Sequence, residues 1–259
     1  MTVFEAQHIG VQYRRNGEPF APFADVSFAL EGGRLYNLTG PSGSGKSTLL
    51  AACALMLPRS GGSLVLNGES FDRFHPTEWR RRVCLVPQAA ALVPGTVRDN
   101  LRFPWTLKVN AGTEPPSDEA LEEMLALAQL DGVTLDHSAA QLSGGQQARV
   151  ALLRAFATRP TVMLLDEVEA ALDEESAVAV SRLTRALLTG GTTCLRIRHR
   201  ADDGYACGTF TLADGAISYE AHPVTADNAP VVGEGVAAAA SSSEDSSAVA
   251  APAPREGSR

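Results

Sequence analysis

Lysine is scarce in this sequence of 259 residues. Of its 22 lysines and arginines, only Lys46 and Lys108 are lysines. Acidic residues outnumber basic ones, 30 against 22, which gives a net charge of −8 and an isoelectric point near 5.2. An acidic chain of this kind is repelled by phosphate backbones, so the composition argues against general affinity for DNA or RNA. Because lysine is otherwise avoided, Lys46 inside a glycine-rich loop indicates a specific task.

Long apolar runs and paired cysteine motifs are also missing. No stretch of 18 apolar residues is present, so we expect no membrane span, and residues 1–10 lack the basic and apolar regions of a signal peptide. The four cysteines, Cys53, Cys84, Cys194 and Cys207, form no C-x-x-C pair, and no histidine lies close enough to complete a zinc site. We therefore expect buried thiols in a reducing cytoplasm.

The segment GPSGSGKST, residues 40–48, matches the phosphate-binding pattern G-x-x-x-x-G-K-[ST]. Its glycines permit positive φ angles, so that backbone N–H groups converge on an anion at a helix N-terminus. Apolar residues 35–39 predict the preceding strand, and residues 48–57 predict the following helix. Lys46 would meet the β- and γ-phosphates, and Ser47 would offer its hydroxyl to Mg²⁺. The predicted nucleotide-binding residues here are Gly40, Pro41, Ser42, Gly43, Ser44, Gly45, Lys46, Ser47 and Thr48.

The remaining apolar pattern predicts an α/β fold with a mostly parallel core sheet. Residues 83–86 and 161–165 are apolar runs, typical of strands buried on both faces, and residues 192–197 are predicted as another buried strand. Residues 89–142 are punctuated by proline and glycine and contain an amphipathic helix over 119–130, which predicts an inserted helical subdomain. Further helices are predicted over 147–158 and 173–188, and a closing hairpin over 209–219.

The N-terminal region predicts an antiparallel β subdomain. Its short strand candidates are residues 3–4, 9–13 and 26–30, and Asn16-Gly17 is a hairpin-type turn. Tyr13 precedes that turn. Two interpretations of Tyr13 stay open at this point: its ring either covers a nucleotide base or packs within the sheet.

The last 39 residues differ from the rest of the chain. Residues 221–259 contain no Leu, Ile, Met, Phe, Tyr or Trp. Such a segment buries too little apolar area to offset its ordering entropy, so we predict a disordered tail. The domain prediction is therefore one nucleotide-binding domain over 1–220, with the helical subdomain at about 89–142, followed by this tail.

The chain resembles the ABC transporter ATPases in five features that follow one another in the sequence. They are the phosphate loop, Gln88, the segment Leu142-Ser143-Gly144-Gly145-Gln146, the segment Leu164-Leu165-Asp166-Glu167, and His199. The resemblance covers roughly residues 3–220. A phosphate loop alone occurs in many NTPases, whereas its combination with LSGGQ and LLDE is typical of one family. The resemblance implies a P-loop NTPase fold with an N-terminal antiparallel subdomain and a helical insertion.

The resemblance also implies a role for each polar residue of the site. Asp166 would hold Mg²⁺ together with Ser47 and Gln88, and Glu167 would be the general base that orients the attacking water. Gln88 resembles the glutamine that senses Mg²⁺ and the γ-phosphate, and His199 resembles the histidine that contacts the γ-phosphate. Tyr13 resembles the aromatic residue that stacks on adenine.

The LSGGQ segment is expected to act on a second copy of the chain. In the family its Ser143, Gly144, Gly145 and Gln146 would contact the γ-phosphate bound by the partner, so that two ATP molecules lie within a homodimer. The resemblance further implies a separate integral-membrane permease, with the ATPase attached peripherally at the cytoplasmic face of the cell membrane. No nucleic-acid partner is expected.

The chain departs from the family pattern in two places. Arg200 follows His199 where an acidic residue is common, and Ala170 stands where a serine is common before Ala171-Leu172-Asp173. Neither departure removes a catalytic group. The retained groups argue against a scaffold without turnover.

A narrower resemblance follows Gln88. Residues 95–105, which end in Phe103-Pro104-Trp105, resemble the same segment of small bacterial ABC ATPases linked to iron export. Phe103 and Trp105 would either anchor the permease or pack inside the helical subdomain. The alternative function is a soluble ABC-type ATPase acting on a ribosome or nucleic-acid complex. Such proteins usually carry two ATPase domains or long insertions, which this chain lacks.

Overall fold

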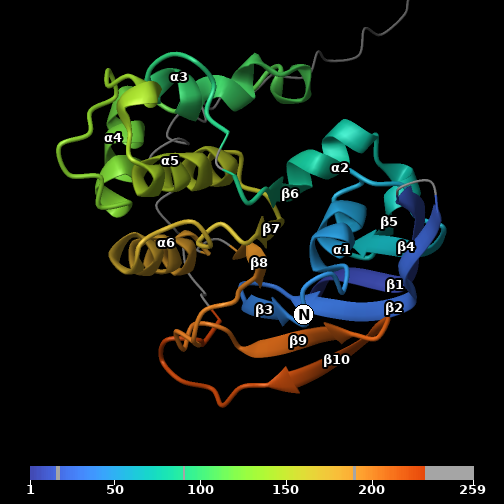
Figure 1. The fold of residues 1–259 in the computed structure, drawn as a ribbon. Coiled ribbons are helices and arrows are strands. Elements are labelled where there is room, and N and C mark those ends of the chain that lie inside the picture. The colour runs from blue at the N-terminus through green and yellow to red at the C-terminus, as the bar shows by residue number, and fades with distance from the viewer. Residues whose placement is uncertain (16–17, 90, 189–190, 231–259) are drawn as a thin grey trace, which may run out of the picture.

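A computed structural model describes residues 1–15, 18–89, 91–188 and 191–230 (Figure 1). The strands are β1 (Thr2–Arg15), β2 (Glu18–Glu31), β3 (Leu35–Thr39), β4 (Gly61–Leu66), β5 (Glu69–Ser70), β6 (Val83–Val86), β7 (Val162–Asp166), β8 (Thr193–Ile197), β9 (Gly208–Ala213) and β10 (Ala216–Ala221). The α-helices are α1 (Lys46–Cys53), α2 (Pro76–Arg82), α3 (Val97–Arg102), α4 (Asp118–Leu127), α5 (Gly144–Ala157) and α6 (Glu174–Leu187). Short 3-10 helices are η1 (Phe71–Arg73), η2 (Phe103–Thr106), η3 (Lys108–Asn110) and η4 (Ala139–Gln141).

The core is a six-stranded sheet in the order β10-β9-β3-β8-β7-β6. All neighbours in it are parallel except the β9–β10 hairpin. Strands β7 and β8 are apolar over most of their length because both faces of the sheet are covered. The α/β prediction with a mostly parallel core sheet is confirmed, and the carboxyl ends of β3, β7 and β8 meet at one edge of it.

An antiparallel sheet of four strands, in the order β2-β1-β4-β5, packs beside this core (Figure 1). The antiparallel subdomain is therefore confirmed, but three short strands were expected where β1 and β2 run for 14 residues each. Register shifts interrupt the pairing, and His8 has a positive φ of 54°. Backbone hydrogen bonds continue through these bulges although the side-chain alternation breaks. The predicted turn at Asn16-Gly17 lies outside the described residues.

The helical subdomain forms a separate lobe around α3, α4 and α5 (Figure 1). Leu121 and Leu125 on α4 join the apolar cluster that contains Val150 and Leu153 of α5. Ser117 begins α4 by accepting a hydrogen bond from the backbone N–H of Ala120. No helix within the described ranges is both long and apolar enough to cross a membrane.

The four cysteines are unpaired thiols. Cys53, Cys194 and Cys207 are buried, and Cys84 is half-buried. Burial raises the pKa of Cys53 and of Cys194 to about 12, because the thiolate is the form that loses hydration. These two side chains therefore act as packing groups at neutral pH.

The ordered chain extends beyond the predicted boundary at residue 220. Strand β10 includes Ala221, and the side chain of Asn228, only 6% exposed, donates hydrogen bonds to the carbonyls of Ala206 and Pro223. Arg185 on α6 also donates to the carbonyls of Asp227 and Ala229. The prediction that the disordered tail begins at residue 221 was wrong for residues 222–230. Polar contacts rather than apolar burial hold these residues against the domain. Residues 231–259, the rest of the predicted tail, lie outside the described residues.

Candidate functional site

The loop between β3 and α1 has the geometry of an anion-binding turn. Gly40, Gly43 and Gly45 have φ angles of 140°, 81° and 99°. A Cβ at Gly40 would lie 2.1 Å from the carbonyl oxygen of Leu212, and one at Gly45 would lie 2.7 Å from Cβ of Pro22. Glycine is therefore required at both positions for two reasons, backbone angle and space. The turn directs the start of α1 toward the open end of the sheet.

Lys46 is held over this loop. The side chain is 5% exposed, and its Nζ donates to the carbonyl oxygens of Gly40 and Pro41 at 2.9 and 3.0 Å. The ammonium is thus enclosed by the loop that wraps the expected phosphates, and within the described residues no carboxylate is bound to it. An anion that entered the loop would meet this charge and the helix N-terminus together.

Ser47 and Asp166 meet across two elements. The Ser47 hydroxyl, at the start of α1, donates to Oδ1 of Asp166, at the end of β7, at 2.8 Å. Burial and the neighbouring charge of Glu167 raise the pKa of Asp166, although the Ser47 hydrogen bond and Lys46 oppose that shift. A hydroxyl and a carboxylate are hard oxygen donors of the kind that Mg²⁺ uses together with phosphate oxygens and waters. The residues present therefore fit the predicted metal.

Glu167 links the other two predicted catalytic residues. Its Oε1 lies 2.7 Å from Nε2 of His199, and its Oε2 accepts a hydrogen bond from Nε2 of Gln88 at 3.4 Å. Gln88 follows β6, Glu167 follows β7 and His199 follows β8, so three neighbouring strands deliver these side chains to one edge of the sheet. Glu167 itself has a φ of 49°, the left-handed region that is uncommon for a non-glycine residue.

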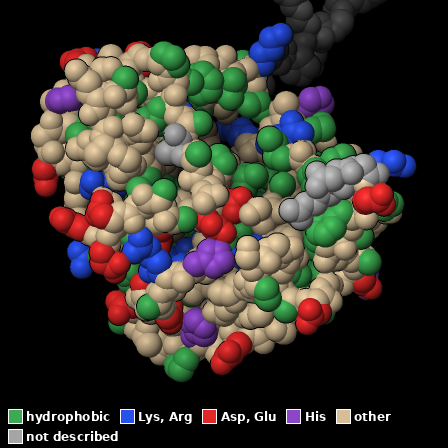
Figure 2. Space-filling model, in the orientation of Figure 1, with side chains coloured by type: hydrophobic (Ala, Val, Ile, Leu, Met, Phe, Trp, Pro, Cys, Tyr) green, Lys and Arg blue, Asp and Glu red, His purple; other side chains and the backbone are tan. Residues whose placement is uncertain are grey.

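A cavity of about 240 Å³ lies over the loop. From the predicted site it is lined by Tyr13, Ser42, Gly43, Gly45, Lys46, Ser47, Thr48, Glu167 and His199. Gly40, Pro41 and Ser44 shape the loop but do not line the cavity. Figure 2 shows a histidine and acidic side chains near the centre of this face.

Phe20 also lines the cavity, and sequence reasoning missed it. Its ring meets that of Tyr13 edge-on, with 5.5 Å between the centroids. The two residues are paired across β1 and β2. A signal was available in the sequence, because a hairpin turn at Asn16-Gly17 places residue 20 opposite residue 13. The aromatic wall of the cavity is therefore a pair of rings from both strands.

The LSGGQ segment lies apart from this cavity. Ser143 caps α5: its hydroxyl accepts from the N–H of Gln146 at 3.3 Å, and Oε1 of Gln146 accepts from the N–H of Ser143 at 2.9 Å. A Cβ at Gly145 would lie 2.4 Å from Oγ of Ser176, so close packing on α6 requires this glycine. None of the residues 143–146 lines the cavity over the phosphate loop.

Three features define a P-loop NTPase: the phosphate loop, the Ser47–Asp166 contact that joins this loop to β7, and a glutamate with histidine and glutamine partners. A family model described as ABC transporter matches residues 23–170, which is more than half of the chain. The protein therefore belongs to the ABC transporter ATPase family. It is an ATPase that couples ATP hydrolysis to transport, the ATP-binding subunit that energises an ABC transporter.

Individual relatives differ in what they transport. The chain is 32% identical over 199 residues to the probable iron export ATP-binding protein FetA of Escherichia coli, covering 76% of this chain and 84% of FetA. It is 41% identical over 155 residues to the sulfate/thiosulfate import ATP-binding protein CysA of Synechocystis, covering 60% of this chain and 42% of CysA. A dimeric post-hydrolysis structure of the ATP-binding cassette MJ0796 with ADP and Pi is 25% identical with a TM-score of 0.74, over 86% of this chain and all of that one.

Proposed function

We propose that this chain hydrolyses ATP at the cavity over the phosphate loop with the residues assembled there. The observation that carries the proposal is the convergence of Tyr13, Lys46, Ser47, Glu167 and His199 on one cavity. Adenine lies against the aromatic pair, and the phosphates lie in the loop beneath Lys46. Ser47 and Asp166 would hold Mg²⁺, which would neutralise phosphate charge when bound.

Glu167 acts as the general base in this proposal. Its carboxylate orients a water molecule toward the γ-phosphate and accepts its proton, while Nε2 of His199 contacts the γ-phosphate. The side chain of His199 is 49% exposed and that of Glu167 is 23% exposed, so both are accessible to a nucleotide and water. Gln88 contacts Glu167 and precedes the helical lobe in the chain. It therefore couples changes in the Glu167–His199 contact to the position of that lobe.

The site is completed by a second copy of the chain. Support comes from the position of the segment 143–146, whose serine and helix N-terminus lie away from this copy's own cavity. A two-fold dimer brings that segment onto the partner's γ-phosphate, so each ATP is held by both chains. The dimeric structure of MJ0796 is consistent with this arrangement.

The proposed docking site for the permease is a groove between α2 and the helical lobe. The groove, about 720 Å³ in volume, is lined by apolar residues including Leu85, Phe103 and Leu107. Figure 2 shows hydrophobic and basic side chains gathered in this hollow. Phe103 lines the groove, which supports the first of its two open interpretations, whereas Trp105 does not line it. We propose that the chain attaches here, peripherally, to its permease at the cytoplasmic face of the membrane.

The charges of the groove indicate the chemistry of the permease segment. Its lining includes Arg80, Arg81, Arg154 and Lys108 but no Asp or Glu, in a protein whose net charge is −8. Nε of Arg81 is buried without a hydrogen-bond partner among the described residues. An apolar permease segment that carries carboxylates would satisfy both features, since a buried arginine without an anion is unfavourable.

Reversing the charge of Arg81 is expected to weaken permease binding. Arg81→Glu places a carboxylate against the expected acidic segment, and Phe103→Ala removes an apolar contact, so each should lower co-purification of the membrane protein by about tenfold or more. Basal ATP turnover should persist. Arg82→Glu is the matched control, because Arg82 pairs with Glu78 and does not line the groove. Equal loss with Arg81→Glu and Arg82→Glu would contradict a role of the groove.

The proposed cargo is a metal ion such as iron, moved outward. Support comes from residues 95–105 and from the match to FetA, which covers 84% of that protein against 42% of CysA. Cells that produce the wild-type chain with its permease should retain less iron than cells with Glu167→Gln, whereas sulfate content should be equal. Equal iron content in both strains would exclude this cargo without affecting the assignment of the ATPase.

A further inference from the structure

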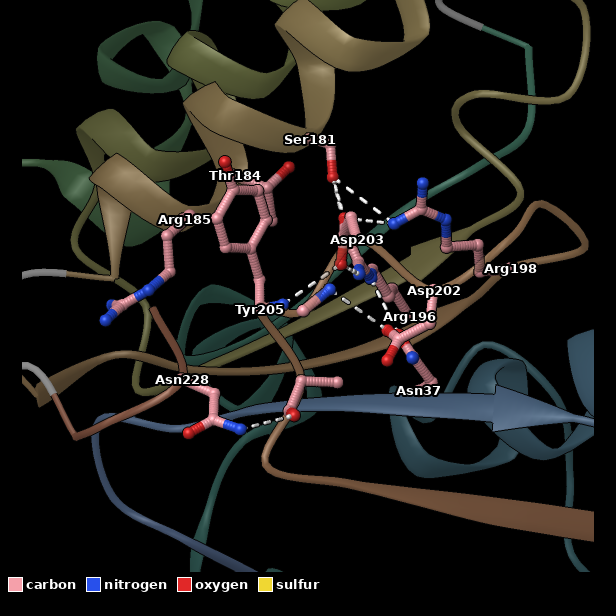
Figure 3. Close-up of polar contacts among 12 residues, drawn as sticks. Asn37, Ser181, Thr184, Arg185, Arg196, Arg198, Asp202, Asp203, Tyr205 and Asn228 are labelled. Carbon is pink, nitrogen blue, oxygen red and sulfur yellow. Dashed lines mark hydrogen bonds and ion pairs between the residues drawn. The ribbon is translucent and has the colours of Figure 1, made fainter. Parts of the chain in front are cut away.

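A buried ionic cluster lies beside the site but outside its cavity. It joins Arg196, Arg198, Asp203 and Glu169 with the hydroxyl of Ser181 on α6, and most of these groups are labelled in Figure 3. The side chain of Arg196 is 2% exposed, that of Glu169 9% and that of Arg198 10%. Two guanidinium groups and two carboxyl groups are thus removed from water at one place, which is costly unless they pair.

The pairing within the cluster is nearly complete. Arg196 donates to Oδ1 of Asp203 at 2.7 Å, to Oδ1 of Asn37 at 2.9 Å and to Ser181 at 2.9 Å. Arg198 pairs with the other oxygen of Asp203. Burial opposes ionisation of Asp203, but the hydrogen bond and charge of Arg196 outweigh it and hold the pKa of Asp203 below its ordinary value. The carboxylate of Asp203 therefore stays charged at neutral pH.

Glu169 is the member that ties the cluster to the catalytic segment. Its Oε2 lies 3.4 Å from Nε of Arg198, and its Oε1 lies 3.7 Å from Nη1 of Arg196. Neither Oε2 of Glu169 nor Nε of Arg198 has a hydrogen bond within the described part of the chain. The contact between these two atoms joins segments that follow different strands, while Arg196 also faces Glu169 and Asp203 also pairs with Arg198.

The same two segments carry Glu167 and His199. Glu169 lies two residues after Glu167, and Arg198 immediately precedes His199. Both catalytic side chains lie beyond the ends of β7 and β8, and Glu167 starts a turn with a left-handed φ of 49° that the N–H of Ala170 closes by bonding to its carbonyl. The exposed contact between Glu167 and His199 is weak by itself, because partly solvated pairs contribute little. The β7–β8 ladder aligns the two segments as far as Asp166 and Ile197, and the buried Glu169–Arg198 contact adds a second link beyond the end of that ladder.

We propose that Glu169 and Arg198 are positioning residues whose buried ion pair fixes the turn carrying Glu167 against the segment carrying His199. The inference rests on the proposed roles of Glu167 and His199. It assigns to this chain a device that the phosphate-loop and LSGGQ motifs do not contain. Removing the pair lets the two side chains drift, and displacements near 1 Å reduce the rate of a positioned reaction by up to about 10²-fold.

The test is steady-state ATP hydrolysis by the full-length chain carrying Glu169→Gln, which removes one charge and keeps the side-chain size. The expected result is a fall in kcat of about tenfold or more, with KM for ATP within about twofold of wild type. Arg198→Lys keeps a positive charge but cannot pair with Glu169 and Asp203 together. Its kcat should therefore lie between that of the wild type and that of Glu169→Gln. The double variant Glu169→Gln/Arg198→Gln leaves neither partner charged without the other. The double variant should fold even if Glu169→Gln does not, and its kcat should be as low as the kcat expected for Glu169→Gln.

Ser181→Ala is the matched control, because it removes a hydroxyl that bonds Arg196, Arg198 and Asp203 but keeps both charged members of the Glu169–Arg198 pair. Its kcat should stay within about twofold of wild type. The ring ¹⁵N signals of His199, assigned with His199→Gln, should move in Glu169→Gln and not in Ser181→Ala. Wild-type kcat in both Glu169→Gln and the double variant, or an equal loss in Ser181→Ala, would overturn the proposal. Glu167→Gln in the same assay separates this outcome from failure of the proposed catalytic roles, since it loses turnover only if those roles hold.

Discussion

Replacing Glu167 with glutamine is expected to lower ATP turnover by about 10²–10⁴-fold, the usual contribution of a general base. Glutamine has the same shape and retains hydrogen bonds toward His199 and Gln88, which approach the carboxylate at 2.7 and 3.4 Å. It cannot accept the proton of water. ATP binding should therefore persist while hydrolysis stops, and the nucleotide-bound dimer should accumulate. Phosphate release and light scattering in the presence of Mg²⁺ and ATP measure the two effects.

Glu31→Gln is a suitable control for this variant. Glu31 pairs with Arg34 on the surface and is not part of the cavity, so the control removes one carboxylate without touching the site. Its turnover and its oligomeric state should match the wild type. Normal ATP turnover by Glu167→Gln would assign the general base to another group. If Glu167→Gln binds ATP but does not dimerise, ATP binding alone does not close the dimer.

Lys46→Ala should abolish measurable ATP binding, a loss of about 100-fold or more in affinity. The substitution removes a buried ammonium from the centre of a loop whose carbonyls, on Gly40 and Pro41, already converge on it. Charge-assisted contacts with phosphate are roughly twice as strong as neutral ones, and backbone N–H groups alone cannot replace them. Isothermal titration with ATP and Mg²⁺ checks this result, and the melting temperature without nucleotide shows whether the loop still folds.

Lys46→Arg distinguishes charge from geometry in the same titration. Arginine keeps the positive charge but carries a planar, longer head that the closely wrapped loop has little room for. We expect its affinity to fall nearly as far as that of Lys46→Ala. Recovery of wild-type affinity with arginine would show that the loop needs only a charge, and wild-type affinity with alanine would remove Lys46 from the binding site.

Much of the site could be predicted because its motifs are local. The phosphate loop, the strand that ends in Asp166 and the cap at Ser143 each depend on a few consecutive residues, and the structure places them at the expected strand and helix ends. Gly40 and Gly45 show how a local motif constrains residue type, since the lack of space for a Cβ and the positive φ at these positions exclude any other residue. Local patterns of this kind constrain backbone geometry before any tertiary contact forms.

The ionic cluster could not be predicted, because its members are far apart in the sequence. Arg196 lies within a fully buried strand beside Cys194, Leu195 and Ile197, and one of its partners, Asn37, is 159 residues away. A buried arginine in such a run has no local signature that reveals its partners. The ordered stretch around Asn228 was missed for a related reason: side-chain amide bonds to distant carbonyls fixed a segment that apolar content alone would leave loose.

The two lysines also have a practical consequence for chemical labelling. Lys46 is enclosed by the phosphate loop, whereas Lys108 is exposed at the rim of the groove proposed for the permease. With no other lysine in the sequence, amine-directed reagents have the N-terminus and Lys108 as their accessible targets. A fluorophore or photo-crosslinker installed this way would sit at the docking surface in the natural sequence. The protein thus provides a natural lysine at the proposed docking surface for following assembly with a membrane partner, without the introduction of a cysteine.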